Sequence, residues 1–235
     1  IDQDTLFYRE VSPDTDAEQA IAGNSFPRML YMRYEGLTNF KLFKWLYQQG
    51  LVDCSTTKFE DMKVPDALLQ SYRDLLKEAQ LMPSTTLVFD GSCTKRWVNA
   101  ICAFRNMHLI TDQSVEMLKG ELLQLLDELE EIAVAGQFRS GKPVSIYISD
   151  MDIEATYCYV AARHYRASCI EAFSINSLRS ADPGMFEHVR RWITSLSRFA
   201  TLVSCSGELQ RIHFFKRQRA IVAELEREGL EPSPE

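Results

Sequence analysis

The segments TTLVFD (85–90) and VSIYISD (144–150), together with the residues between them, decide the fold. Both segments are short apolar runs rich in β-branched and aromatic residues, which favour strands. Between them, residues 114–134 repeat apolar side chains at the spacing of a helix. A strand, a helix and a second strand in this order predict a crossover unit with two parallel strands.

The same alternation extends over most of the chain. We expect further strands at 28–35, 107–112, 168–175, 199–206 and 210–216, and further helices at 37–49, 64–80, 95–104, 152–165 and 182–198. This pattern predicts an α/β fold with a mainly parallel sheet and helices on both faces. Because only residues 207–209 separate the last two strands, we expect those strands to form an antiparallel hairpin at the edge of the sheet.

One domain is expected to account for most of the chain. Its 235 residues suffice to bury a full core. Residues 1–28 are turn-rich and predict an irregular N-terminal arm, residues 29–217 a single α/β domain, and residues 218–235 a charged helix with a tail.

Composition excludes several classes of protein. Hydrophobic residues make up 46% and charged residues 25%, which argues against disorder over most of the length. The formal net charge of −7 repels a phosphate backbone, so binding of RNA or DNA would need a local basic patch. The apolar runs are too short to cross a bilayer, and residues 1–4 (IDQD) are acidic where a signal peptide is basic. We therefore expect an intracellular protein, in the cytoplasm or nucleus, without membrane contact.

Cysteine and histidine spacing argues against a metal or redox site. The six cysteines lie far apart without a C-x-x-C pair, and the four histidines occur singly. Buried, reduced thiols are the expected state, and a structural zinc ion is not expected. The glycine-rich motifs that bind dinucleotides or nucleoside triphosphates do not occur either, so we expect no cofactor.

Acidic residues follow several predicted strands. Asp90 and Asp112 each end one, and Asp150, Asp152 and Glu154 follow another. The carboxyl ends of parallel strands meet at one edge of a sheet, where a cluster of carboxylates can bind Mg²⁺ or Mn²⁺ and activate water for phosphodiester hydrolysis. Aspartate is equally favoured after a strand as a helix cap or turn former, so both interpretations stay open.

Two of these segments resemble the XPG and flap-endonuclease branch of PIN-like nucleases. SDMDIEATYCYVAA (149–162) is similar to the internal acidic motif of that family, and LVFDGS (87–92) resembles its V-F-D-G strand. The resemblance covers roughly residues 85–180. It implies a PIN-like sheet, metal ligation by Asp90, Asp152 and Glu154, and a catalytic set that also includes Asp150.

The chain also departs from the family pattern. Where the family carries a further acidic set of the E-D-S-D type, residues 171–177 read EAFSINS, so only Glu171 could substitute. The first-strand aspartate is also missing, since that stretch offers only Glu35. Two-metal hydrolysis needs enough carboxylates to hold both ions. We therefore favour a degenerate PIN-like domain that serves as an interaction or scaffold domain of a larger assembly concerned with RNA or chromatin, with a protein partner. The alternative is an Mg²⁺- or Mn²⁺-dependent nuclease.

One basic stretch suggests a nucleic-acid surface. Arg211, Lys216, Arg217 and Arg219 surround the aromatic pair Phe214–Phe215. Cations interleaved with aromatic side chains are typical of surfaces that bind RNA or DNA. A strand with a buried apolar face, followed by a solvated helix start, accounts for the same residues without any nucleic acid.

Overall fold

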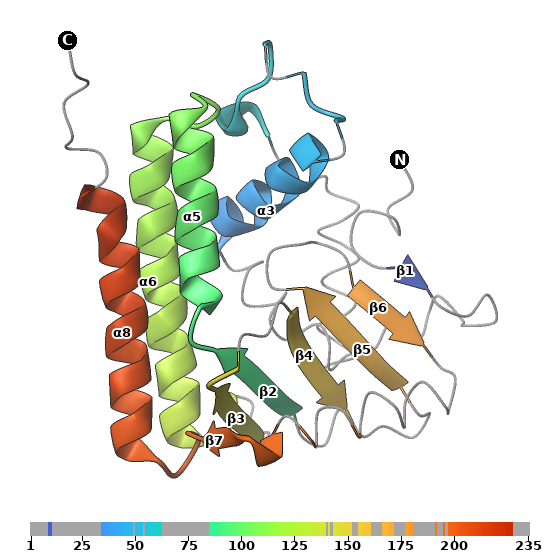
Figure 1. Ribbon diagram of the computed structural model, residues 1–235, viewed down its shortest axis with the longest axis vertical. Helices are drawn as coiled ribbons and strands as arrows, with labels where there is room; N and C mark the ends of the chain where they lie inside the picture. The colour runs from blue at the N-terminus through green and yellow to red at the C-terminus, as the bar shows by residue number, and fades with distance from the viewer. Residues whose placement is uncertain are drawn as a thin grey trace.

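A computed structural model describes the chain at residues 9–10, 34–48, 50–53, 55–62, 85–139, 141, 143–151, 155–160, 166–171, 177–180, 191, 195 and 197–227. These residues form an α/β fold in which helices α5, α6 and α8 lie side by side and α3 crosses them (Figure 1). The α/β class predicted from the sequence is thereby confirmed.

The strands form one sheet with mixed directions. In chain order they are β1 (Arg9–Glu10), β2 (Thr85–Asp90), β3 (Val144–Ser149), β4 (Ala155–Val160), β5 (Arg166–Glu171), β6 (Ser177–Ser180) and β7 (Ala200–Leu202). Their order across the sheet is β1-β6-β5-β4-β2-β3-β7. The pairs β2–β3 and β1–β6 are parallel, whereas β2–β4, β4–β5, β5–β6 and β3–β7 are antiparallel. The prediction of a mainly parallel sheet is therefore wrong, although the central crossover unit from β2 to β3 is parallel as expected.

The helices are α3 (Glu35–Gln48), the short 3-10 helix η2 (Phe59–Asp61), α5 (Cys93–Asn106), α6 (Asp112–Ala135) and α8 (Glu208–Arg227). Helix α8 contacts both α5 and α6, so these three form a single helical layer among the described residues (Figure 1). Helices were expected on both faces of the sheet, and the described residues show one such layer, formed by α5, α6 and α8. Helix α8 also runs without a break through the boundary predicted at 217/218.

Helix α6 organises the core. Its apolar side chains recur at helical spacing and are buried, namely Val115, Leu118, Leu122, Leu125, Leu126, Leu129 and Ile132. Aromatic residues of α3 and α5 extend this core, and the rings of Phe40 and Phe104 meet edge to face with centroids 5.4 Å apart. The helix begins where Thr111 Oγ1 accepts a hydrogen bond from Ser114 N, and it ends at Gly136 with φ of 62°.

Glu60 of η2 ties the start of α6 to the rest of the fold. Its carboxylate accepts hydrogen bonds from Thr111 N and Thr111 Oγ1, both 2.8 Å away, and from Ser114 Oγ at 2.5 Å. Partial burial alone would raise the pKa of Glu60, but the bonds from Ser114 and Thr111 outweigh it and lower the pKa below its ordinary value. A negative charge also favours a helix N-terminus, so the ionised carboxylate stabilises α6.

Three predicted elements are wrong. Residues 107–111 form a turn in which Leu109 and Ile110 are buried, and Asp112 begins α6, so no strand is present at 107–112. A short apolar run also fits a buried connection. Residues 155–160 (ATYCYV) form β4 where a helix was predicted, in keeping with their β-branched and aromatic content. Residues 210–216 belong to α8, so the predicted edge hairpin does not exist, and β7 pairs with β3 instead.

The other predicted elements are confirmed or lie outside the described residues. Strands at 85–90, 144–150, 168–175 and 199–206 and helices at 37–49, 95–104 and 114–134 correspond to β2, β3, β5, β7, α3, α5 and α6. The helix predicted at 64–80 lies outside the described residues, as do most of the strand at 28–35 and most of the helix at 182–198.

Candidate functional site

The carboxyl ends of β2 and β3 lie next to each other. Asp90 pairs with Ser149 in the parallel register, so Asp150 follows at the level of Gly91 on the neighbouring strand. Adjacent strands are about 4.8 Å apart, which places the two predicted acidic positions at one edge of the sheet. The crossover unit therefore brings together two of the strand ends that the sequence singled out, those at Asp90 and Asp150.

The carboxylate of Asp90 is buried and engaged by its own chain. Only 2% of the residue is exposed. One oxygen accepts hydrogen bonds from Ser92 N and Ser92 Oγ, each 2.9 Å long, and the other accepts one from Arg96 at 2.7 Å. Arg96 also donates to Ser92 Oγ at 2.6 Å. These bonds form a compact ionic turn between β2 and the first turn of α5.

The remaining predicted acids are placed differently. Asp150 is exposed, and Asp152 and Glu154 lie outside the described residues. Asp112 is the first residue of α6 and pairs with Arg105 at 2.7 Å, so its assignment to a strand end was wrong. Within the part of the chain that the structure describes, no three acidic, cysteine or histidine side chains are grouped so that they could hold a metal ion.

A polar contact that the sequence did not reveal connects α8 to this edge. Gln218 is fully buried, and its Nε2 donates to the carbonyl of Gly91 at 3.1 Å. Cys93 Sγ donates to Gln218 Oε1 at 3.7 Å. Burial, with a smaller contribution from the negative charge of Asp90, raises the pKa of the Cys93 thiol to about 11. A thiol that stays protonated at neutral pH is a weak nucleophile, so Cys93 serves packing and hydrogen bonding.

Two of the four predicted nucleic-acid-binding cations are used inside the fold. Arg211 is buried and donates to the carbonyl of Val203 at 3.1 Å. Arg219 donates to Asp127 at 2.7 Å and to Glu130 at 2.5 Å, so it joins α8 to α6. Burial alone would lower the pKa of Arg219, but the bonds to Glu130 and Asp127 together outweigh it and raise the pKa. The guanidinium of Arg211 is therefore buried, and that of Arg219 is engaged by two carboxylates of α6.

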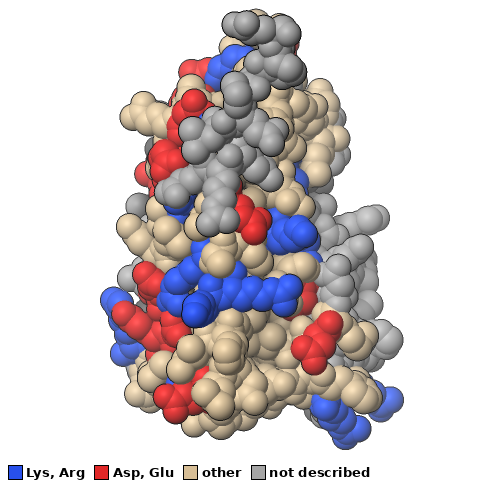
Figure 2. All heavy atoms as spheres, turned by 60° about the vertical axis from the view of Figure 1, so that its left-hand side comes forward, with Lys and Arg blue, Asp and Glu red and all other residues tan. Residues whose placement is uncertain are grey.

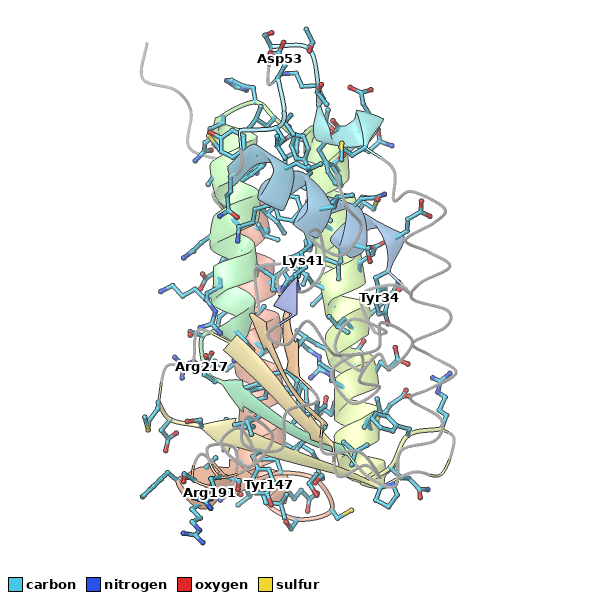
Figure 3. The ribbon with its side chains drawn as sticks, turned by 90° about the vertical axis from the view of Figure 1, so that its right-hand side faces the viewer. Tyr34, Lys41, Asp53, Tyr147, Arg191 and Arg217 are labelled. Carbon is cyan, nitrogen blue, oxygen red and sulfur yellow. The ribbon has the colours of Figure 1, made fainter. Side chains whose placement is uncertain are left out.

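The other two cations are exposed on α8. Lys216 and Arg217 are both exposed, and Figure 2 shows basic side chains gathered in a band across one face of the molecule. Arg217 lies beside the end of β2 (Figure 3), where a Cβ added to Gly91 would be 3.8 Å from its terminal nitrogen. The candidate site therefore combines an aspartate paired with Arg96, the exposed Asp150 and the exposed Arg217.

No family model, curated protein or solved structure that was compared with the chain matches it. Among the described helices, none is both long and apolar enough to span a membrane.

Proposed function

We propose that this protein is a non-catalytic interaction domain of a larger intracellular assembly concerned with RNA or chromatin, built on a degenerate PIN-like fold. The observation that carries the proposal is the state of Asp90. Of the three predicted metal ligands, Asp90 is the one that lies among the described residues, and its carboxylate is buried in contact with Arg96 and Ser92. It acts as a structural group at the start of α5.

The chemistry of this contact disfavours a divalent cation. Mg²⁺ and Mn²⁺ bind through carboxylate lone pairs, and hydrogen bonds from Ser92 and Arg96 occupy three of the about four that Asp90 offers. The guanidinium of Arg96 also places a positive charge 2.7 Å from one carboxylate oxygen, where it would repel a second cation. A nuclease that uses Asp90, Asp150, Asp152 and Glu154 would first have to break this ion pair.

An exposed face of α8 supports a protein partner. This outer face of α8 consists of Leu209, Ile212, His213, Lys216 and Arg217, all exposed and spaced to lie on one side of the helix. Leu209 is 69% and Ile212 45% exposed. Because Arg211 and Arg219 form contacts within the fold, only Lys216 and Arg217 of the four predicted cations remain to bind a phosphate backbone. Adjacent apolar and basic side chains are instead suited to binding a protein surface.

Affinity capture with matched variants tests the proposal. Three baits would be compared in extracts of the cells that make the protein. They are the wild type, a variant with Leu209→Glu and Ile212→Glu on the outer face of α8, and a control variant with Leu51→Glu and Val134→Glu elsewhere. Leu51 and Val134 are also exposed, at 53% and 56%, so the control changes charge and polarity equally. Circular dichroism would establish that all three baits fold.

We expect the wild type and the control to retain the same set of proteins, and the α8 variant to lose that set. The proposal is wrong if the α8 variant retains everything that the wild type retains, or if the wild type retains nothing above bare resin.

A further inference from the structure

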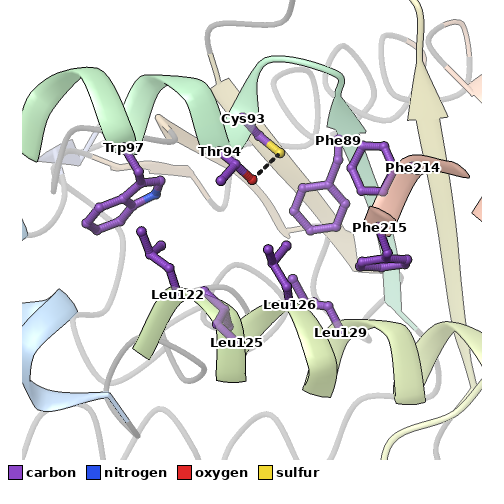
Figure 4. Close-up of a pocket in the computed structure, with 10 residues that line it drawn as sticks. All are labelled: Phe89, Cys93, Thr94, Trp97, Leu122, Leu125, Leu126, Leu129, Phe214 and Phe215. Atoms are coloured by element: carbon purple, nitrogen blue, oxygen red, sulfur yellow. Dashed lines mark hydrogen bonds between the residues drawn. The ribbon is translucent and has the colours of Figure 1, made fainter. Parts of the chain in front are cut away.

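An apolar cavity lies inside the helical layer. It has a volume of about 50 Å³, is partly open to the surface, and is lined by side chains of β2, α5, α6 and α8 (Figure 4). Aromatic rings and leucines make up most of its wall, with Phe89, Trp97, Phe214 and Phe215 on one part and Leu122, Leu125, Leu126 and Leu129 of α6 on the other. The cavity is thus built from the same residues that join the three helices.

The polar groups of the wall are few. Thr94 Oγ1 and Cys93 Sγ lie 3.8 Å apart within hydrogen-bonding distance of each other, and Cys93 Sγ also faces Gln218 Oε1. A buried water molecule needs two to four polar partners, whereas cavities lined by leucine and phenylalanine stay dry. Water therefore gains little by entering, and an apolar group gains both dispersion contacts and removal from water.

We propose that this cavity is a binding site for a small, uncharged, apolar ligand of about the size of a xenon atom or a short alkyl group. The size follows from comparison with engineered cavities, since one of about 150 Å³ binds benzene or xenon and the present cavity has about a third of that volume. The inference goes beyond the proposed interaction function. A ligand here would contact α5, α6 and α8 together and stabilise their packing against one another.

Xenon titration of protein carrying ¹³C-labelled leucine methyl groups tests the proposal. We expect saturable shifts of the methyl signals of Leu122, Leu125, Leu126 and Leu129, whereas the exposed Leu209 serves as an internal control for weak surface adsorption. Absence of shifts at the highest xenon pressure would overturn the proposal. Shifts of Leu209 as large as those of the cavity leucines would do the same.

Two variants of one wall residue make the test specific. Leu126→Phe should fill the cavity and abolish the xenon shifts of the other three leucines. Leu126→Ala should enlarge the cavity and raise its affinity for benzene about tenfold or more over the wild type. If Leu126→Phe does not fold, the benzene measurement on Leu126→Ala still decides, because an unchanged benzene affinity would refute an accessible apolar site at this position.

Discussion

Replacing Asp90 by alanine should destabilise the fold strongly, because it removes a buried charge that its neighbours are arranged to meet. The carboxylate is 2% exposed and is held by Ser92 and Arg96, whose side chain is 24% exposed. Removing one partner of a buried ion pair costs about 3–5 kcal/mol. Since the Arg96 guanidinium can still turn partly to water, we expect a loss near the lower end, about 3 kcal/mol.

Urea unfolding followed by circular dichroism would measure this loss. A change of about 3 kcal/mol lowers the urea midpoint by about 1 M, with an unchanged slope. Asp150→Ala is the matched control, because Asp150 is exposed at the same sheet edge and its replacement should cost no more than about 0.5 kcal/mol. Equal midpoints for the two variants would refute the reasoning, since Asp90 would then contribute nothing to the fold and its carboxylate would be available for chemistry.

Three further predictions concern other positions. Gly136→Ala should destabilise by more than about 2 kcal/mol in urea unfolding, because φ at Gly136 is 62° and an added Cβ would overlap Cys205 Sγ. Gly120→Ala in the interior of α6, where an added Cβ meets nothing within 4 Å, should instead stabilise the protein by about 0.5–1 kcal/mol. A Gly120→Ala variant that is less stable than Gly136→Ala would contradict the reasoning for both glycines. The lowered pKa of Glu60 means that its ionised form stabilises the fold above the ordinary glutamate pKa and that this contribution is lost as the pH falls through the folded pKa. The stability difference between wild type and Glu60→Gln should therefore narrow between about pH 6 and pH 3, and a constant difference would exclude the capping role. Iodoacetamide at neutral pH should modify the exposed Cys205 and leave the half-buried Cys93 unmodified until the protein is denatured, because burial raises the pKa of Cys93 to about 11. Peptide mass spectrometry would measure the two modification rates, and equal rates would contradict the raised pKa of Cys93.

The sequence was sufficient where a regular apolar period matched the buried face. Residues 114–134 show eight buried apolar positions in α6, and TTLVFD and VSIYISD combine strand-forming residues with short length. In these segments local preference and tertiary packing agree, so the helix and the parallel pair β2–β3 could be predicted.

The prediction failed where polar residues occupy a buried face. Along α8 the buried positions include Arg211, Phe215, Gln218 and Val222, and two of these four are polar. Because Arg211 and Gln218 interrupt the apolar period, the neighbouring run Ile212–Phe215 gave the appearance of a strand. Arg211 donates a hydrogen bond to the carbonyl of Val203 and Gln218 donates one to the carbonyl of Gly91, and both acceptors lie outside α8. The periodicity of the helix sequence does not report such contacts.

The candidate site was predictable in position and only partly in role. Strand-end aspartates were expected at the edge formed by β2 and β3, and the structure places Asp90 and Asp150 there. The ion pair between Asp90 and Arg96 was not predicted, although Arg96 lies only six residues after Asp90. A carboxylate that could serve as a ligand or as a cap is assigned only when its neighbours are known.

Calorimetric titration of Mn²⁺ tests the central claim most directly. The wild type would be compared with the double variant Asp152→Asn with Glu154→Gln, and cleavage of single-stranded and flap nucleic-acid substrates would be measured in parallel. The account predicts no saturable heat and no metal-dependent cleavage for either protein. Saturable binding by the wild type that disappears in the double variant, together with Mn²⁺-dependent cleavage, would contradict it and establish a nuclease.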